Sequence, residues 1–241
     1  MKERAQELVG KLSQSTDAPV LVVLDNVQNW SGDTKPQPIP VATALLVTTR
    51  QRKLGGSAFQ HHQVEMLQPP ADADLVRKVA GRQLAELDGL LECLGGHALA
   101  LELAGAYLAN NPLKTPAQYL KALQKGGAVE QSAAPEVCYQ RTVEQAFKVT
   151  WDQLDGNTRN AWQLASCFEP EPVSRELSES ACLKEDQLNI LYKNHLIGVS
   201  DDGRWQMHRL TRAFGQRSGT DGQLQRDRQS VARTRERVVR Y

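Results

Sequence analysis

Two short apolar runs near the beginning of the chain predict buried β-strands. Residues 20–24 read VLVVL and residues 44–47 read ALLV, and neither run alternates with polar positions. Unbroken runs of this length, rich in branched side chains, are typical of parallel strands that helices cover on both faces. A weaker third strand is predicted at residues 63–67. Residues 1–68 are therefore expected to form part of an α/β sheet.

Helical spacing replaces the strand pattern further along the chain. Apolar positions recur every three or four residues along residues 91–108, which predicts either a pair of helices or one helix kinked at Gly95 and Gly96. Thr115 opens a capping-box sequence, so another helix should begin there. Residues 69–135 are therefore expected to form an all-α domain.

A third pattern, helices followed by a hairpin, occupies residues 136–217. The sequence DDG at residues 201–203 suits a tight loop with its glycine in the left-handed conformation, which would place Val199 opposite Trp205. Helices followed by such a hairpin predict a winged helix. The predicted fold class is thus α/β followed by all-α and winged-helix units. Residues 218–241 form a basic tail, which we expect to begin a further C-terminal region.

Composition and charge narrow the function classes. The chain has 241 residues, 40% of them apolar, and 29 Lys and Arg against 28 Asp and Glu, so no bulk charge draws it to nucleic acid or a membrane. The spacing of the four cysteines matches no metal clip, which predicts reduced core thiols. No uninterrupted apolar segment reaches membrane length, and the first ten residues lack a signal-peptide pattern. The expected location is the cytoplasm.

Polar side chains follow both predicted strands. Asp25 comes directly after the first apolar run, where open α/β sheets place their ligands and where a carboxylate could hold Mg²⁺. Thr49 and Arg50 follow the second run, and a guanidinium there could bind phosphate oxygens. Taken singly, Asp25 is equally well explained as a turn residue that hydrogen-bonds to the next loop, and Arg50 as a side chain that points into solvent.

Four segments, in order along the chain, resemble motifs of NB-ARC proteins, the nucleotide-binding signalling ATPases of the STAND class. Residues 21–27, LVVLDNV, resemble the Walker B segment, and residues 45–50, LLVTTR, resemble the sensor-one strand. Residues 93–101, CLGGHALAL, are similar to the GLPL segment. Residues 196–209 resemble the winged-helix segment that ends in Met-His-Asp, here Met-His-Arg. Residues 1–68 would then be the C-terminal part of a P-loop NTPase domain with a partial parallel sheet.

The resemblance implies a site for ADP or ATP with Mg²⁺. Asp25 would help to hold the metal, Arg50 would sense the terminal phosphate, and Gly96 with Leu99 would shape the nucleoside pocket. His208 would meet the β-phosphate of ADP and lock the winged helix over it. The implied nucleotide-binding positions are Asp25, Asn26, Thr49, Arg50, Gly96, Ala98, Leu99 and His208, with Asp25 also the metal ligand.

Several positions depart from the family pattern. Asn26 replaces a second acid and cannot accept a proton from water, so hydrolysis should be slow at best and enzymatic activity is left open. Ala98 stands where the family has proline, and Arg209 where it has aspartate. The chain contains no GxxxxGK[ST] sequence. The family places that loop upstream of Walker B and its strand between the Walker B and sensor-one strands. This chain should therefore be a fragment that lacks both the loop and the central strand, with weak or no independent nucleotide binding.

Three functions remain open. The main hypothesis is a signalling switch that exchanges ADP for ATP and then self-associates, with Asp25, Arg50 and His208 converging on one hollow. A winged-helix DNA-binding transcription regulator is the alternative from another class, although Asp201 and Asp202 at the wing tip would repel phosphates. A degenerate scaffold that no longer uses nucleotide is the third.

Overall fold

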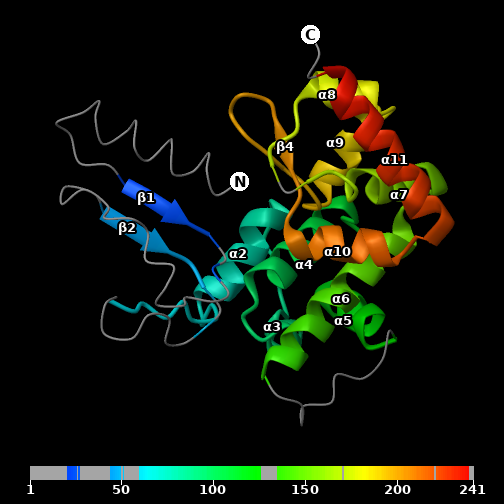
Figure 1. Ribbon diagram of the computed structural model, residues 1–241. Helices are drawn as coiled ribbons and strands as arrows, with labels where there is room; N and C mark the ends of the chain where they lie inside the picture. Colours follow the sequence, from blue (N-terminus) through cyan, green and yellow to red (C-terminus); the bar gives the residue numbers. More distant parts are fainter. Residues whose placement is uncertain are drawn as a thin grey trace. The chain divides into compact units, whose positions relative to one another are not determined.

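The computed structural model describes residues 21–25, 27, 44–49, 51, 60–125, 135–169, 171–219 and 221–238 (Figure 1). The chain forms two compact units, Met1–Glu65 and Met66–Tyr241. Each unit is considered by itself below. The domain boundaries predicted inside the second unit stay a prediction.

The first unit contains a small parallel sheet. Strands β1 (Leu21–Leu24) and β2 (Ala44–Val47) pair directly, with Leu21 opposite Ala44 and Leu24 opposite Val47. Both strands were predicted. Within this chain they pair directly, so each satisfies the inner backbone groups of the other.

One face of this sheet is open. Leu21 and Val23 of β1 are 60% and 55% exposed, and Leu46 of β2, which lies opposite Val23, is 52% exposed. The alternate residues are half-buried. Burial of both faces, expected from the unbroken apolar runs, is therefore not found on this face.

The third predicted strand is absent from the described residues. Residues 63–67 have no strand assignment, and Val64 is 95% exposed. The backbone N–H of Leu67 donates instead to the Gly96 carbonyl oxygen at 2.9 Å. Leu67 thus pairs with the turn between two helices.

Four helices begin the second unit, and α4 lies among the other three. Helix α4 packs against α2, α3 and α5 and also against α6. Its Leu101, Ala104 and Leu108 are fully buried, as expected of a helix that is apolar on most sides. The helices are α2 (Ala71–Ala80), α3 (Asp88–Leu94), α4 (Ala98–Asn110) and α5 (Pro116–Lys125).

Local signals set the ends of these helices. Gly95 ends α3 in the left-handed conformation at φ 60°, and its N–H donates to the Leu91 carbonyl. The region is therefore a pair of helices and not one kinked helix. The predicted capping box is confirmed, because the Gln118 N–H donates to the Thr115 hydroxyl at 3.2 Å and the Thr115 N–H to the Gln118 side chain at 3.1 Å.

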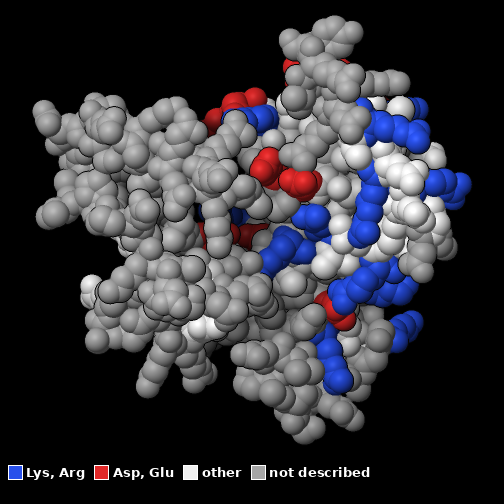
Figure 2. Space-filling view, in the orientation of Figure 1, with Lys and Arg blue, Asp and Glu red and all other residues white. Residues whose placement is uncertain are grey.

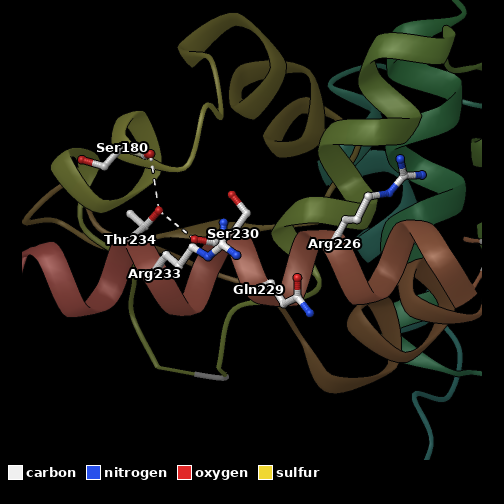
Figure 3. Close-up of a pocket in the computed structure, with 6 residues that line it drawn as sticks. All are labelled: Ser180, Arg226, Gln229, Ser230, Arg233 and Thr234. Carbon is white, nitrogen blue, oxygen red and sulfur yellow. Dashed lines mark hydrogen bonds between the residues drawn. The ribbon is translucent and has the colours of Figure 1, made fainter.

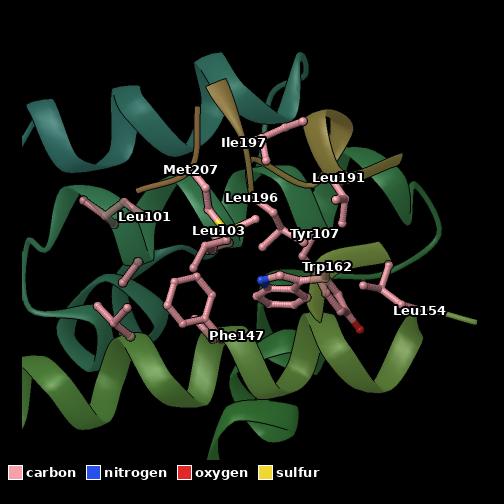
Figure 4. Packing of buried hydrophobic residues seen from close by; sticks show 14 of the residues in the cluster. Leu101, Leu103, Tyr107, Phe147, Leu154, Trp162, Leu191, Leu196, Ile197 and Met207 are labelled. Carbon is pink, nitrogen blue, oxygen red and sulfur yellow. The ribbon is translucent and has the colours of Figure 1, made fainter. Parts of the chain in front are cut away.

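An aromatic cluster joins α6 (Pro135–Gln153), α7 (Gly156–Ala165) and α10 (Arg209–Arg217). Trp162 of α7 is fully buried, with its ring centroid 5.2 Å from that of Phe214 on α10 and 5.9 Å from that of Phe147 on α6. Its indole N–H donates to the Thr211 carbonyl at 3.1 Å. Figure 4 shows Trp162 beside Phe147 in the buried cluster.

A small antiparallel arrangement follows α8 (Arg175–Ser180) and α9 (Glu185–Lys193). Strands β3 (Gly198–Val199) and β4 (Trp205–Gln206) pair with Val199 opposite Trp205, as predicted. The loop at 201–203 has Gly203 at φ 77°, which glycine adopts without steric cost. Val173 bridges to Trp205 on the other side of β4.

The predicted basic tail contains a helix that packs on the core. Helix α11 (Asp221–Val238) contacts α7 and α8, and its Val231 and Thr234 are buried. One buried cluster therefore includes side chains from α2 to α11. None of the described helices is long and apolar enough to cross a membrane.

The described cysteines are free thiols, but they are not all in the core. Cys93 and Cys167 are half-buried, and burial raises the pKa of each thiol. Cys182 is exposed, so the expectation of a core thiol is wrong at this position. It lies in the turn after α8 at φ 65°, between Ala181 and Leu183, which are the residues that the core buries there.

The crossing of α2 and α4 gives a stability prediction. A Cβ at Gly105 would lie 2.6 Å from the Val79 Cβ and 3.0 Å from the Val76 carbonyl oxygen. Gly105→Ala should therefore lower the free energy of unfolding by about 1–3 kcal/mol, because helix α4 would have to move away from α2. Urea denaturation of the two proteins measures the change.

Gly222→Ala is the matched control, because a Cβ at this position of α11 meets no atom within 4 Å. It should leave the unfolding midpoint unchanged or raise it slightly, since alanine favours the helix. Equal effects of the two substitutions would contradict the close helix crossing.

Candidate functional site

Polar groups at the carboxyl ends of β1 and β2 are hydrogen-bonded to one another. The Thr48 hydroxyl donates to the Asp25 carboxylate at 2.5 Å. The Thr48 N–H donates to the Leu24 carbonyl, and the Val27 N–H donates to the Thr48 carbonyl, both at 2.9 Å. The Thr49 hydroxyl donates to the Val27 carbonyl at 2.6 Å. These bonds extend the connection between the strands into the two segments that leave the sheet.

The Asp25 side chain is exposed and presents a carboxylate at this edge. Only one of its oxygens accepts from Thr48. The other oxygen makes no hydrogen bond to another described residue and is available to a ligand. No group of three or more His, Cys, Asp or Glu side chains gathers anywhere in the described part of the chain. A single carboxylate nevertheless suits Mg²⁺, which keeps several waters and takes substrate phosphates as further ligands.

Two of the predicted residues of this edge, Asn26 and Arg50, lie outside the described residues. The structure brings Asp25 and Thr49 to the same edge through the bonds of Thr48 and Val27. Their roles toward a nucleotide stay a prediction.

The predicted nucleoside-pocket residues lie at the beginning of α4. Gly96 is buried at φ 72°, and a Cβ there would lie 2.3 Å from the Leu67 carbonyl oxygen. The close backbone contact explains the glycine without a ligand. Ala98 is exposed and Leu99 is half-buried in the first turn of α4, so both are near the surface of the second unit.

His208 is the N-cap residue of α10. Its imidazole Nδ1 accepts from the Leu210 N–H at 3.2 Å, and its backbone is extended at φ −60° and ψ 142°. Partial burial, and next the charge of Arg209, lower the pKa of this imidazole. Because Nδ1 accepts a hydrogen bond, the neutral ring carries its proton on Nε2 and offers that N–H as a donor.

Met207 connects His208 to the core. Its side chain belongs to the buried cluster that includes Leu101 and Leu103 of α4, and Figure 4 shows it on the side of Leu103. The backbone at His208 is thus fixed by the buried residue directly before it. Asp25 and His208 belong to different compact units, so their predicted convergence with Arg50 stays a prediction.

The hollow that the structure describes contains none of the predicted site residues. It has a volume of about 380 Å³ and lies between the end of α8 and one side of α11 (Figure 3). Figure 2 shows positive side chains along the part of the visible face where α10 and α11 lie. The arginine-rich C-terminal segment was the sequence signal for this surface, but it did not reveal the hollow.

Comparison with known proteins supports the motif-based recognition. No protein-family model matches the chain. A disease resistance protein of Arabidopsis thaliana, RML1A, is 23% identical over 224 residues, which cover 86% of this chain and 20% of the relative. A crystal structure of a Signal Transduction ATPase with Numerous Domains (STAND) protein with a tetratricopeptide repeat sensor, from Pyrococcus horikoshii, covers 94% of this chain with a TM-score of 0.58 and 15% identity.

These similarities agree with the ordered motifs and support an NB-ARC/STAND-type protein. The chain spans about a fifth of the plant relative and 31% of the archaeal protein chain. At this identity the archaeal structure shows the fold alone: a largely helical chain with a small parallel sheet. Activities of the complete relatives are considered for this chain only as proposals.

The lowered pKa of His208 predicts a pH dependence of stability. Unfolded histidine titrates near 6.5, so the unfolded chain takes up this proton at a higher pH than the folded chain does. The stabilisation is complete above about pH 6.5 and is lost as the pH falls through the folded pKa. His208→Asn, which keeps a side-chain acceptor at the N-cap, should lose less stability than the wild type between pH 7.5 and about 5.5.

Urea unfolding at the two pH values measures this difference. His97, whose pKa burial also lowers, should account for part of the slope that remains. His62→Asn is the control, because His62 is exposed and caps no helix. An NMR titration of the His208 imidazole with a midpoint at or above 6.5 would contradict the prediction.

Proposed function

We propose that this chain is the core of a nucleotide-dependent signalling switch of the NB-ARC type. The observation that carries the proposal is the hydrogen bond between Thr48 and Asp25 at the shared carboxyl edge of two parallel strands. Ligands of open parallel sheets bind at this edge. The order of the four motifs and the two relatives support the same function.

In this proposal ADP or ATP binds with Mg²⁺ at the sheet edge and against the second unit. Asp25 supplies a metal ligand, held in place by the Thr48 hydroxyl. Thr49 and Arg50 follow the adjacent strand and sense the terminal phosphate. Gly96, Ala98 and Leu99 border the nucleoside, and the metal supplies charge neutralisation of the phosphates when bound.

We further propose that residues 136–217 form a winged helix. The order α7, Val173 bridge, α8, α9, β3 and β4 supports this, because Val173 pairs with β4 and completes a small sheet with the hairpin. The Trp205 indole also donates to the buried Ser178 hydroxyl at 2.7 Å, which fixes the hairpin on α8. His208 follows the hairpin at the corner that leads into α10.

The physical basis of the switch is a difference in contacts between two nucleotide states. His208 would donate from Nε2 to the β-phosphate of ADP, whereas Arg50 would contact the terminal phosphate of ATP. A ligand shifts a conformational equilibrium only by its differential affinity for the two states. Exchange would then release the winged helix and permit self-association, in the cytoplasm.

Nucleotide affinity of these 241 residues is proposed to be weak, because the sequence contains no GxxxxGK[ST] loop to surround the phosphates. Hydrolysis is proposed to be slow at best, because the amide of Asn26 can orient a water molecule but cannot take its proton. Binding and release, and not turnover, would carry the signal.

Equilibrium dialysis and NMR titration with ADP and Mg²⁺ test the proposal on the full chain. We expect saturable binding that is weaker than micromolar, and Asp25→Asn and His208→Asn should each weaken it at least about fivefold, the lower end of the usual coupling range. Asp201→Asn and His62→Asn are matched controls at exposed positions outside the proposed site.

Micromolar binding by the wild-type chain would contradict the weak affinity that the missing loop implies. No saturable binding at millimolar ADP would show that these 241 residues do not bind the nucleotide independently. Equal losses from the site variants and their controls would show that the assigned residues do not contact the nucleotide.

DNA binding by the winged helix is disfavoured by its charges. Glu185 and Asp186 lie in the first turn of α9. Asp202 at the hairpin tip accepts from Arg204 and Ser200, which holds the pKa of this carboxyl well below its usual range. We therefore expect no DNA retention by the chain in a salt-titrated shift assay at physiological ionic strength, since phosphate contacts would have to overcome these carboxylates.

A further inference from the structure

The hollow between α8 and α11 has the chemistry of an anion site. All of its lining residues are polar or basic, and none is acidic: Ser180, Arg226, Gln229, Ser230, Arg233 and Thr234. Figure 3 shows Ser180 at the end of α8 on the side of α11 where Thr234, Ser230 and Arg233 lie, with Arg226 and Gln229 further along the helix and directed away from Ser180. A lining without apolar or acidic side chains suits a charged, strongly solvated ligand.

The two guanidinium groups of the hollow are not neutralised by an ion pair. Arg226 and Arg233 are seven residues apart on α11, which places them on the same side of the helix about 10.5 Å apart along its axis. Neither lies within 4.0 Å of a carboxylate among the described residues. By contrast, Arg175, Arg204 and Arg217 each pair with an acid, at 2.8 Å, 2.5 Å and 2.7 Å.

Arg226 is partly fixed by its own helix. Its Nε donates to the Gly222 carbonyl at 3.2 Å and one terminal nitrogen donates to the Gln223 side chain at 3.0 Å. Its charge acts on the neighbouring Asp227, whose carboxylate accepts from Gln223 at 3.0 Å. The other terminal nitrogen of Arg226 is left as a donor, and Arg233 makes no hydrogen bond to another described residue.

Thr234 forms the floor of the hollow. It is buried, and its hydroxyl donates to the Ser230 carbonyl at 2.9 Å and to the Ser180 carbonyl at 3.4 Å (Figure 3). The hydroxyls of Ser180 and Ser230 and the amide of Gln229 make no hydrogen bond to another described residue. The helix is thus held against α8 by Thr234, while three neutral donors remain for a ligand.

We propose that this hollow binds a phosphomonoester. Such a group carries a charge of about −1.5 to −2 at pH 7 and three acceptor oxygens, which complements the guanidinium of Arg233, the neighbouring hydroxyl donors and the more distant positive charge of Arg226. A carboxylate has only one charge and fewer acceptors. Nucleic acid offers singly charged phosphates along a continuous track, and the hollow is instead bounded at both ends by Arg226 and Arg233. None of the predicted nucleotide-binding residues takes part.

Isothermal titration with O-phospho-L-serine, and with inorganic phosphate as a second probe, tests the site on the full chain at constant ionic strength. We expect saturable binding at one site, weakened at least tenfold by Arg233→Gln and at least threefold by Arg226→Gln. Arg228→Gln is the matched control, because Arg228 is exposed on the same helix and does not line the hollow. It should change the affinity less than twofold.

Further measurements distinguish the possible sources of the phosphomonoester and provide a second test variant. A phosphoserine peptide that binds more tightly than the free amino acid would identify a phosphoprotein as the source, and equal affinity would identify a small molecule. Arg233→Lys keeps the positive charge but loses the planar guanidinium, so it should bind with intermediate affinity. If circular dichroism shows that Arg233→Gln does not fold, Arg233→Lys is the test variant in its place.

Heat no greater than that of added chloride would overturn the proposal. An equal loss with Arg228→Gln would overturn it too, because general attraction to the helix would then explain the binding. If a DNA oligonucleotide displaces phosphoserine with a steep salt dependence, the ligand class of the hollow is nucleic acid and not a phosphomonoester. ADP binding is measured in parallel with Arg233→Gln, and its persistence shows that the two sites are separate.

Discussion

Burial of helix α4 is the constraint on which the second unit depends. The helix packs against α2, α3, α5 and α6, and its small residues Ala104 and Gly105 permit the close crossing with α2. A helix that is buried along most of its length cannot shift without opening cavities or clashes in several neighbours at once. The packing therefore holds both ends of the helix in place. Ala98 and Leu99 lie at its beginning, and Asn110 lies at its end, where the Asn110 side chain donates to the Lys193 carbonyl at 3.2 Å.

The candidate functional residues derive their positions from the packing and hydrogen bonds of neighbouring residues. His208 follows Met207, which is buried, and Trp205, which bonds to Val173 through the backbone and to Ser178 through the indole. Asp25 is positioned by two backbone bonds beyond the strands and by the Thr48 hydroxyl. An exposed imidazole and an exposed carboxylate are thus positioned by hydrogen bonds and packing of the residues beside them. The α8–α11 hollow follows the same principle, since the buried Thr234 fixes its floor.

Features that depend on residues close together in the sequence were predicted correctly. The hairpin register at Val199 and Trp205, the left-handed Gly203 and the capping box at Thr115 depend on a few consecutive side chains, and the structure has all of them. The failures concern partners that are distant in sequence. Residues 63–67 have strand-like composition, but the structure has no strand there and the Leu67 N–H donates to the turn at Gly96.

The sequence by itself pointed to the NB-ARC/STAND type, through four ordered motifs that the comparisons support. It also determined the type and approximate extent of most elements, because periodicity and capping act over a few residues. Only the tertiary structure decided that β1 pairs directly with β2, that the arginine-rich end packs as α11 on α7 and α8, and that Arg226 and Arg233 share a hollow with Ser180. These features depend on which surfaces meet. That choice is made by the packing of the whole core, in which each side chain contacts residues remote in the chain, and no local pattern encodes it.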